Sequence, residues 1–152
     1  MVFKKNRDYK CAVCESEFNL KCNHTKDYIY ILKVCGEHCF IKCIKQHTTI
    51  FSDSFISDTI NKTEFKSRAE LCFARFLNKH KIAWKYEPDK IKLNSGKVYI
   101  PDFYIPESKI YIEVKYGLWE SGAYSKFKEF DSTNSIILIN KEFMKRINIK
   151  YE

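Results

Sequence analysis

The feature that most constrains this chain is a pair of apolar runs on either side of a proline turn. Residues 101–105 read Pro-Asp-Phe-Tyr-Ile, the turn begins at Pro106, and residues 110–115 read Ile-Tyr-Ile-Glu-Val-Lys. Two short runs rich in Ile, Tyr, Val and Phe around such a turn predict a β-hairpin. We therefore expect a sheet that is organised around this hairpin.

The hairpin gathers charged side chains on one face. Side chains alternate along a strand, so Glu113 and Lys115 point to the same side while Val114 points to the other. Asp102 lies on the facing strand, within reach of that side. Grouping charges on an apolar strand pair costs stability unless something binds between them. Two carboxylates suit Mg²⁺, and a neighbouring lysine could polarise a water, which is the equipment for metal-assisted attack on a phosphodiester. The alternative is a surface hairpin in which Glu113 and Lys115 form a weak ion pair.

The segments around the hairpin predict an α/β fold with a mixed sheet. Apolar residues recur at helical spacing over residues 63–82, and strands are expected at 82–87, 90–93 and 98–105. A helix is expected over 121–130, a strand buried on both faces over 135–139, and a basic amphipathic tail over 141–152. With the hairpin, the order α-β-β-β-α-β describes a mixed sheet flanked by helices.

The helix of residues 63–82 offers a third carboxylate. Glu70 follows Ala69 at the edge of the apolar stripe, which makes it a candidate for the site. The alternative is that Ser67 and Glu70 form a capping box, in which Glu70 only closes the start of a helix. We expect the helix to begin near Thr63, which favours the functional role.

Cysteines dominate the first third of the chain and indicate a metal site. The chain has seven cysteines, six of them between residues 11 and 43, and no apolar signal region precedes them. Metal ligation therefore explains them better than disulfides, with buried free cysteines as the alternative. Cys11 and Cys14 form a C-x2-C pair, and Cys35 and His38 supply a second pair with C-x2-H spacing. Cys39 is the alternative fourth ligand, and Cys22 and His24 stay open.

The predicted module around these cysteines is small and depends on its metal. A knuckle at 11–14, a strand at 28–34 and a ligand pair that opens a helix have the layout of a treble-clef zinc finger. Four tetrahedral ligands would bind Zn²⁺ and fold a module too small for its own core. We expect this module over residues 1–50, with a loose arm at 1–10, then a connector over 51–62 and the α/β domain over 63–152.

Composition points to a polyanionic partner. The net charge is +8, with 27 Lys and Arg against 19 Asp and Glu, which suits nucleic acid or, alternatively, a plain basic surface. No run of 18 apolar residues is present, so a cytoplasmic protein without a membrane partner is expected.

The motifs together resemble the PD-(D/E)xK nuclease superfamily. The resemblance covers residues 63–143 and rests on Glu70 in a helix, the Pro101-Asp102 pair and the run 113–115, in the matching order of elements. It implies a restriction-endonuclease-like fold in which Asp102, Glu113 and the Val114 carbonyl hold Mg²⁺ or Mn²⁺. It also implies that Lys115 assists the attacking water and that Glu70 is an accessory ligand. The runs 99–104 and 112–114 look like the very-short-patch-repair-like branch, and the N-terminal finger resembles treble clefs attached to phage and mobile-element endonucleases.

These observations lead to a preferred hypothesis and two alternatives. The preferred one is a Mg²⁺-dependent DNA endonuclease whose zinc finger aids DNA binding. The first alternative is a catalytically silent, zinc-dependent nucleic-acid-binding or regulatory protein on a nuclease fold. The second is a nuclease that acts on RNA or only inside an assembly. A chain that nicks and a homodimer that cuts both strands both fit the sequence.

Overall fold

A computed structural model describes residues 5–22, 34–45, 60 and 62–151. The N-terminal part begins with an antiparallel hairpin of β1 (Lys5–Lys10) and β2 (Glu17–Cys22), in which Lys10 is paired with Glu17. The loose arm expected at residues 1–10 is therefore wrong from residue 5 onward. Cross-strand pairs stabilise this hairpin, since Asn19 donates to Asp8 at 2.9 Å and the Tyr9 and Phe18 rings lie 6.2 Å apart. The strand expected at 28–34 falls outside the described residues, apart from Val34.

The larger part is built on a four-stranded mixed sheet, as predicted. Its strands are β3 (Lys85–Tyr86), β6 (Phe103–Ile105), β7 (Ile110–Lys115) and β8 (Ile136–Asn140), side by side in that order. The β6–β7 hairpin is confirmed, with Phe103 paired to Ile112. β8 runs parallel to β7, and α4 (Ala123–Asp131) makes the crossover that a parallel pair requires. Residues 136–139 are buried, as expected of a strand covered on both faces.

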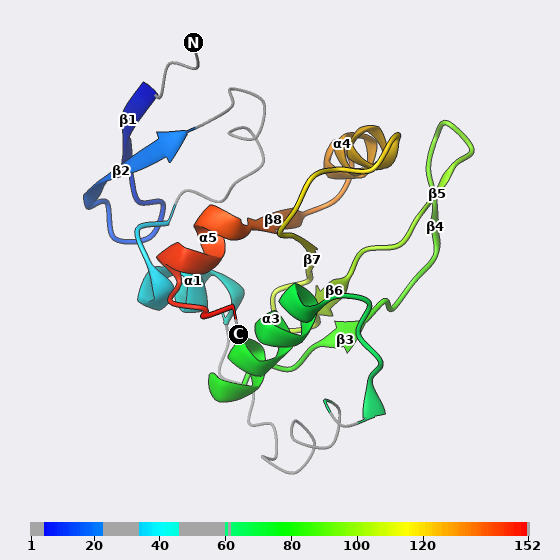
Figure 1. The fold of residues 1–152 in the computed structure, drawn as a ribbon, viewed down its shortest axis with the longest axis horizontal. Coiled ribbons are helices and arrows are strands. Elements are labelled where there is room, and N and C mark those ends of the chain that lie inside the picture. Colours follow the sequence, from blue (N-terminus) through cyan, green and yellow to red (C-terminus); the bar gives the residue numbers. More distant parts are fainter. Residues whose placement is uncertain (1–4, 23–33, 46–59, 61, 152) are drawn as a thin grey trace.

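One predicted strand is divided in two. Residues 98–105 were expected to be continuous, but β5 (Val98–Tyr99) pairs with β4 (Ile91–Lys92) in a separate two-stranded hairpin. The chain leaves this pairing at 100–102 and enters β6 only at Phe103. Pro101 lacks a backbone N–H for a sheet ladder, which explains the break. Figure 1 shows the β4–β5 hairpin at the opposite end of the molecule from β1 and β2.

The helix α3 (Arg68–Lys79) packs on the sheet through its apolar stripe. Phe73 is fully buried, and its ring meets the ring of Phe103 in β6 edge-on at 5.4 Å. The helix starts five residues later than the predicted Thr63, because Ser67 is its N-cap.

The N-terminal helix shares its core with the α/β part. Phe40 of α1 (Glu37–Ile44) is fully buried, and its ring lies 5.0 Å from that of Phe143 in α5 (Lys141–Arg146) and 5.9 Å from that of Phe76 in α3. The predicted boundaries at 50–51 and 62–63 adjoin residues outside the described part of the chain. Among the helices that the structure describes, none is long and apolar enough to span a bilayer.

Candidate functional site

Four cysteine sulfurs converge where the first hairpin meets α1. Cys11 and Cys14 lie in the turn between β1 and β2, and Cys35 and Cys39 lie at the start of α1. All four sulfurs are within 4.8 Å of one another, with 3.6 Å from Cys14 to Cys35 and 3.6 Å from Cys35 to Cys39. Four thiolates about 2.3 Å from a tetrahedral zinc stand about 3.8 Å apart, so the spacing suits such an ion. This group could hold a metal such as zinc.

Backbone groups support the inner sulfur of the cluster. The N–H groups of Val13 and Cys35 both point at Cys11 Sγ from 3.4 Å. Burial raises the pKa of Cys11, but these donors and Cys14 outweigh it and lower the pKa to about 6. Burial and the neighbouring sulfurs raise the pKa of Cys39 to about 12. Four packed thiols cannot all ionise by themselves, so a bound cation would stabilise the thiolates.

The fourth residue of the cluster is Cys39 rather than the predicted first choice, His38. Cys39 is buried, whereas His38 is exposed and is not part of the group. The orientation of the first turn of α1 explains this choice: the helix begins at Glu37, and the side chain of Cys39 is buried among the other sulfurs while that of His38 is exposed. The side chain of Cys22 and all of His24 lie outside the described part.

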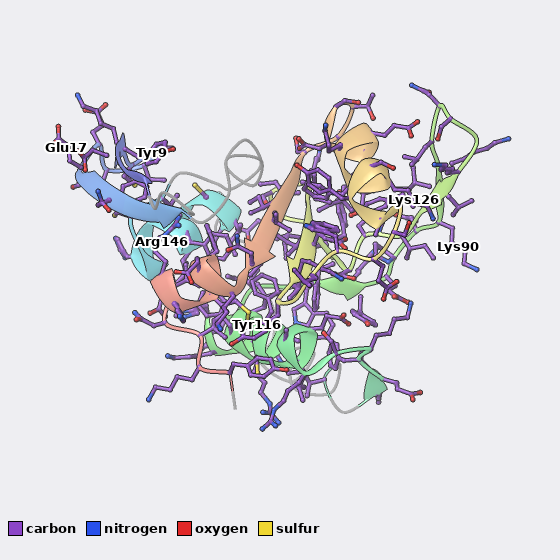
Figure 2. All side chains as sticks on the ribbon, turned by 45° about the horizontal axis from the view of Figure 1, so that its top comes forward. Tyr9, Glu17, Lys90, Tyr116, Lys126 and Arg146 are labelled. Carbon is purple, nitrogen blue, oxygen red and sulfur yellow. The ribbon has the colours of Figure 1, made fainter. Side chains whose placement is uncertain are left out.

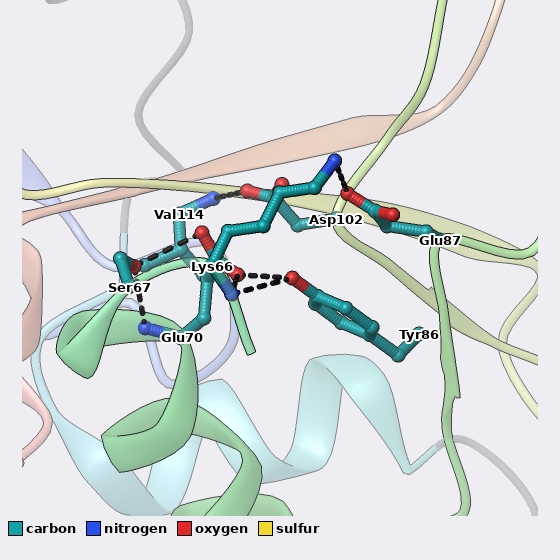
Figure 3. Close-up of polar contacts among 7 residues, drawn as sticks. All are labelled: Lys66, Ser67, Glu70, Tyr86, Glu87, Asp102 and Val114. Carbon is teal, nitrogen blue, oxygen red and sulfur yellow. Dashed lines mark hydrogen bonds and ion pairs between the residues drawn. The ribbon is translucent and has the colours of Figure 1, made fainter. Parts of the chain in front are cut away.

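The hairpin places Asp102 against β7. Asp102 precedes β6 by one residue, and its Oδ2 accepts the backbone N–H of Val114 at 2.7 Å (Figure 3). The side chain thereby extends the β6–β7 pairing by one more bond. Burial, and then the charge of Glu113, raise the pKa of Asp102 well above its ordinary value.

Glu113 is held by a tyrosine that the sequence did not single out. The Tyr99 hydroxyl donates to Glu113 Oε2 at 2.5 Å. Burial raises the pKa of Glu113 to about 7, although the Tyr99 bond and the charge of Lys115 both oppose the rise. Lys115 follows on the same side of β7, with its ammonium 5.6 Å from the centre of the Trp119 ring. The one available signal for Tyr99 was its place just ahead of the Pro101-Asp102 pair.

Glu70 closes the start of α3. Ser67 Oγ donates to Glu70 Oε1 at 2.9 Å, and Oε2 accepts the Lys66 N–H at 3.2 Å and the Tyr86 hydroxyl (Figure 3). Ser67 in turn accepts the N–H of Glu70 at 3.2 Å. The helix start expected near Thr63 is wrong, because α3 begins at Arg68, and the capping interaction of Ser67 with Glu70 is present. The charge of Glu70 nevertheless raises the pKa of both Asp102 and Glu113, so the residue belongs to the same neighbourhood.

Two further charged residues complete this neighbourhood. The ammonium of Lys66 forms an ion pair with Glu87 Oε1 (Figure 3). The Glu87 backbone N–H donates to the Asp102 carbonyl at 2.8 Å. The charges of Glu87, Glu70 and Asp102 all raise the pKa of Lys66. No sequence motif marks either residue, because the turn after β3 and the loop before α3 bring them together.

The two sites differ in how ready they are for a metal. Within the described ranges, the four cysteines already bring their ligand atoms close enough together to share one metal ion. The carboxylates of Glu70, Asp102 and Glu113 do not form such a cluster. Each carboxylate instead has its own protein donor. Asp102 Oδ1 and Glu113 Oε1 have no hydrogen-bond partner in this part of the chain. The one side-chain N or O atom there that is both buried and unbonded is Ser108 Oγ, so these two oxygens reach solvent.

Comparison with known proteins gives no relative on which a function could rest. No protein-family model matches the chain, and neither a curated protein nor a solved structure matches it.

Proposed function

We propose that this protein is a Mg²⁺-dependent endonuclease that hydrolyses DNA phosphodiester bonds on a restriction-endonuclease-like fold. The observation that carries the proposal is that Asp102 and Glu113 both lie just beyond the Phe103–Ile112 pair of the β6–β7 hairpin, with Lys115 on the same side of β7 as Glu113. This is the arrangement expected from the PD-(D/E)xK resemblance. The mixed sheet with helices before and after it supports the same assignment.

The residues fit a hard divalent ion. Asp102 and Glu113 are both largely shielded from water, both have a raised pKa, and each keeps one carboxylate oxygen open to solvent. A cation between two such carboxylates relieves their desolvation and mutual repulsion, and oxygen donors are what Mg²⁺ or Mn²⁺ prefers. When bound, the ion would polarise the scissile phosphate and stabilise its added negative charge.

The protein's own groups have separate roles in this proposal. The Val114 N–H orients Asp102, and the Tyr99 hydroxyl orients Glu113, so that each presents its second oxygen to the ion. The Val114 carbonyl directly follows Glu113 in the chain and is the expected backbone ligand. Lys115 holds the attacking water. Glu70 has both oxygens bonded, so its contribution is the order of the α3 start and an added negative charge rather than direct ligation.

The cysteine cluster supplies a structural zinc site in this proposal, and the module around it adds affinity for DNA. A closed four-cysteine site leaves no open position for a substrate, which suits a structural role.

A second function, a catalytically silent DNA-binding regulator, is favoured by one observation. Every carboxylate near the hairpin already has a protein donor, and Glu70 has three.

Cleavage of supercoiled plasmid in Mg²⁺ distinguishes the two. We expect wild-type protein to nick or linearise the plasmid, and Asp102→Asn and Glu113→Gln to lower the rate by about 10³-fold or more while DNA binding stays within a few-fold. Glu17→Gln is the matched control, since Glu17 is exposed in β2 and lies far from the β6–β7 hairpin in Figure 2. Full cleavage by either site variant would remove the proposal. A wild type that binds DNA and never cuts it would favour the regulator.

A further inference from the structure

One face of the molecule carries exposed cations around the C-terminal segment 148–151. Two hollows flank this segment. The first, of about 450 Å³, lies on the side of Tyr116 and α5, and the second, of about 310 Å³, lies on the side of α3. We call them together the basic groove. Among the residues that the structure describes, its lining includes five cations and no Asp or Glu: Arg75, Lys79, Lys141, Lys145 and Lys150.

The cations on α3 form a line. Arg68, Arg75 and Lys79 are all exposed and are spaced by seven and then four residues, so they lie on one face of the helix. With a rise of 1.5 Å per residue, the line is about 16 Å long. Arg68 begins it at the N-terminal end of α3, the end of the helix from which Glu70 contributes to the carboxylate neighbourhood.

An aromatic stack ties the groove to the end of β7. The rings of Tyr116 and Tyr151 are 4.2 Å apart and 15° from parallel. Arg68 lies over Tyr151 at 5.9 Å, and Lys141 lies over Tyr116 at 5.6 Å, so the stack holds a cation on each side. Tyr116, labelled in Figure 2, directly follows Lys115 in the chain, so the groove begins at the C-terminal end of β7.

We propose that the basic groove binds the phosphate backbone of duplex DNA that runs from the Asp102–Glu113 pair along α3. The inference rests on the proposed function, since this DNA is its substrate. Phosphates follow one another about every 3.4 Å along one strand, so a line of about 16 Å passes about five of them. Charge complementarity is strong, because the acidic residues beside the groove line neither hollow: Glu142 pairs with Lys145 at 3.7 Å, and Glu37 accepts a hydrogen bond from Asn148 at 3.1 Å.

A membrane surface fits this face less well than DNA. The exposed large hydrophobic side chains in the described part of the chain are Val98, Leu118 and Tyr151, and only Tyr151 belongs to the groove. A membrane-surface helix needs a continuous apolar face beside its cations. The groove instead offers cations in line and open to solvent, as phosphate contacts require.

The test compares two triple variants that remove the same charge. The groove variant is Arg75→Gln/Lys79→Gln/Lys150→Gln. The control variant is Lys90→Gln/Lys92→Gln/Lys97→Gln, which changes three exposed residues of the β4–β5 region. Figure 2 labels Lys90 and Tyr116 and shows that this region lies well apart from the groove. Binding of a labelled duplex DNA is followed by fluorescence anisotropy across a salt series, with zinc present and Mg²⁺ absent. We expect the groove variant to bind the duplex about tenfold more weakly than the wild type. The negative slope of log K against log salt should become shallower by about 2–3, because three phosphate contacts are removed. The control variant should stay within about twofold.

Equal losses in both variants, or no loss in the groove variant, would overturn the inference. So would a duplex RNA whose binding depends on the groove while DNA binding does not. Because no cleavage occurs without Mg²⁺, the result does not depend on the catalytic proposal. A protein that never cuts DNA can still pass this test, and an active nuclease can fail it.

Discussion

At the scale of single residues, Glu113 links the acidic site to stability. Its pKa is about 7 in the folded chain against an ordinary 4.5, mainly because of burial. Between these values the folded chain binds more protons than the unfolded chain, so the free energy of unfolding must fall as pH rises through that window. Glu113 therefore destabilises the metal-free protein at neutral pH.

Glu113→Gln should remove this pH dependence. The variant keeps an acceptor for Tyr99 but does not titrate. Urea unfolding at a series of pH values, with zinc and ionic strength held constant, should show wild type losing roughly 1–3 kcal/mol relative to the variant between pH 5 and 8. Mg²⁺ at pH 8 should raise the melting temperature of the wild type only. Parallel curves for the two proteins would show that Glu113 has an ordinary pKa.

The sequence shows some of these residues and hides others for a physical reason. Asp102, Glu113 and Lys115 follow from strand alternation, because a period of two fixes which side chains share a face. Tyr99 and Lys66 reach the same place through a broken strand and a loop, and no periodicity relates them to the hairpin. Glu70 was assigned to the right neighbourhood, but its bonds depend on where α3 begins, which is the least regular part of a helix.

At the scale of elements, the start of α1 decides the cysteine cluster. Spacing alone could not choose between His38 and Cys39, because the choice depends on where α1 begins and on which side chain of its first turn is directed at the other sulfurs. We expect Cys39→Ser to lose about one equivalent of zinc per chain and His38→Ala to keep it, as measured by metal analysis after gel filtration. Serine is close to cysteine in size, so a loss reflects the missing thiolate. Zinc retained in Cys39→Ser and lost in His38→Ala would restore the C-x2-H pair.

The elements that the sequence predicted well are those with a buried face. β8 and the β6–β7 hairpin carry continuous or alternating apolar residues, and α3 carries a full apolar stripe. The sequence did not predict β1, because this strand is held by its pairing with β2 rather than by a buried apolar face. Polar cross-strand pairs such as Asp8 with Asn19 leave no apolar pattern in the sequence. The split at Pro101 was visible in principle, since proline rarely sits inside a paired strand.

At the scale of the whole molecule, the cysteine module and the α/β part are parts of one core. Phe40 of α1 is fully buried beside Phe143 and Phe76. Polar contacts cross the same junction: Glu37 bonds His80 at 2.7 Å and Asn148 at 3.1 Å. The division into residues 1–50 and 63–152 therefore describes the order of the chain better than it describes packing.

This shared core predicts that removing zinc destabilises the α/β part as well. Both tryptophans of the chain, Trp84 and Trp119, lie in the α/β part, so their fluorescence reports that part alone. Releasing the cysteine site should loosen α1 and withdraw Phe40 from its contacts, and losing such a side chain costs about 3–5 kcal/mol. A chelator should therefore lower the melting temperature seen by tryptophan fluorescence by about 10 °C or more, in a single transition.

Phe40→Ala should reproduce most of this shift with zinc present, whereas His38→Ala, at an exposed position, should not. An unchanged tryptophan transition after full zinc removal would mean that the two parts fold independently and that α1 is only in contact with α3 and α5.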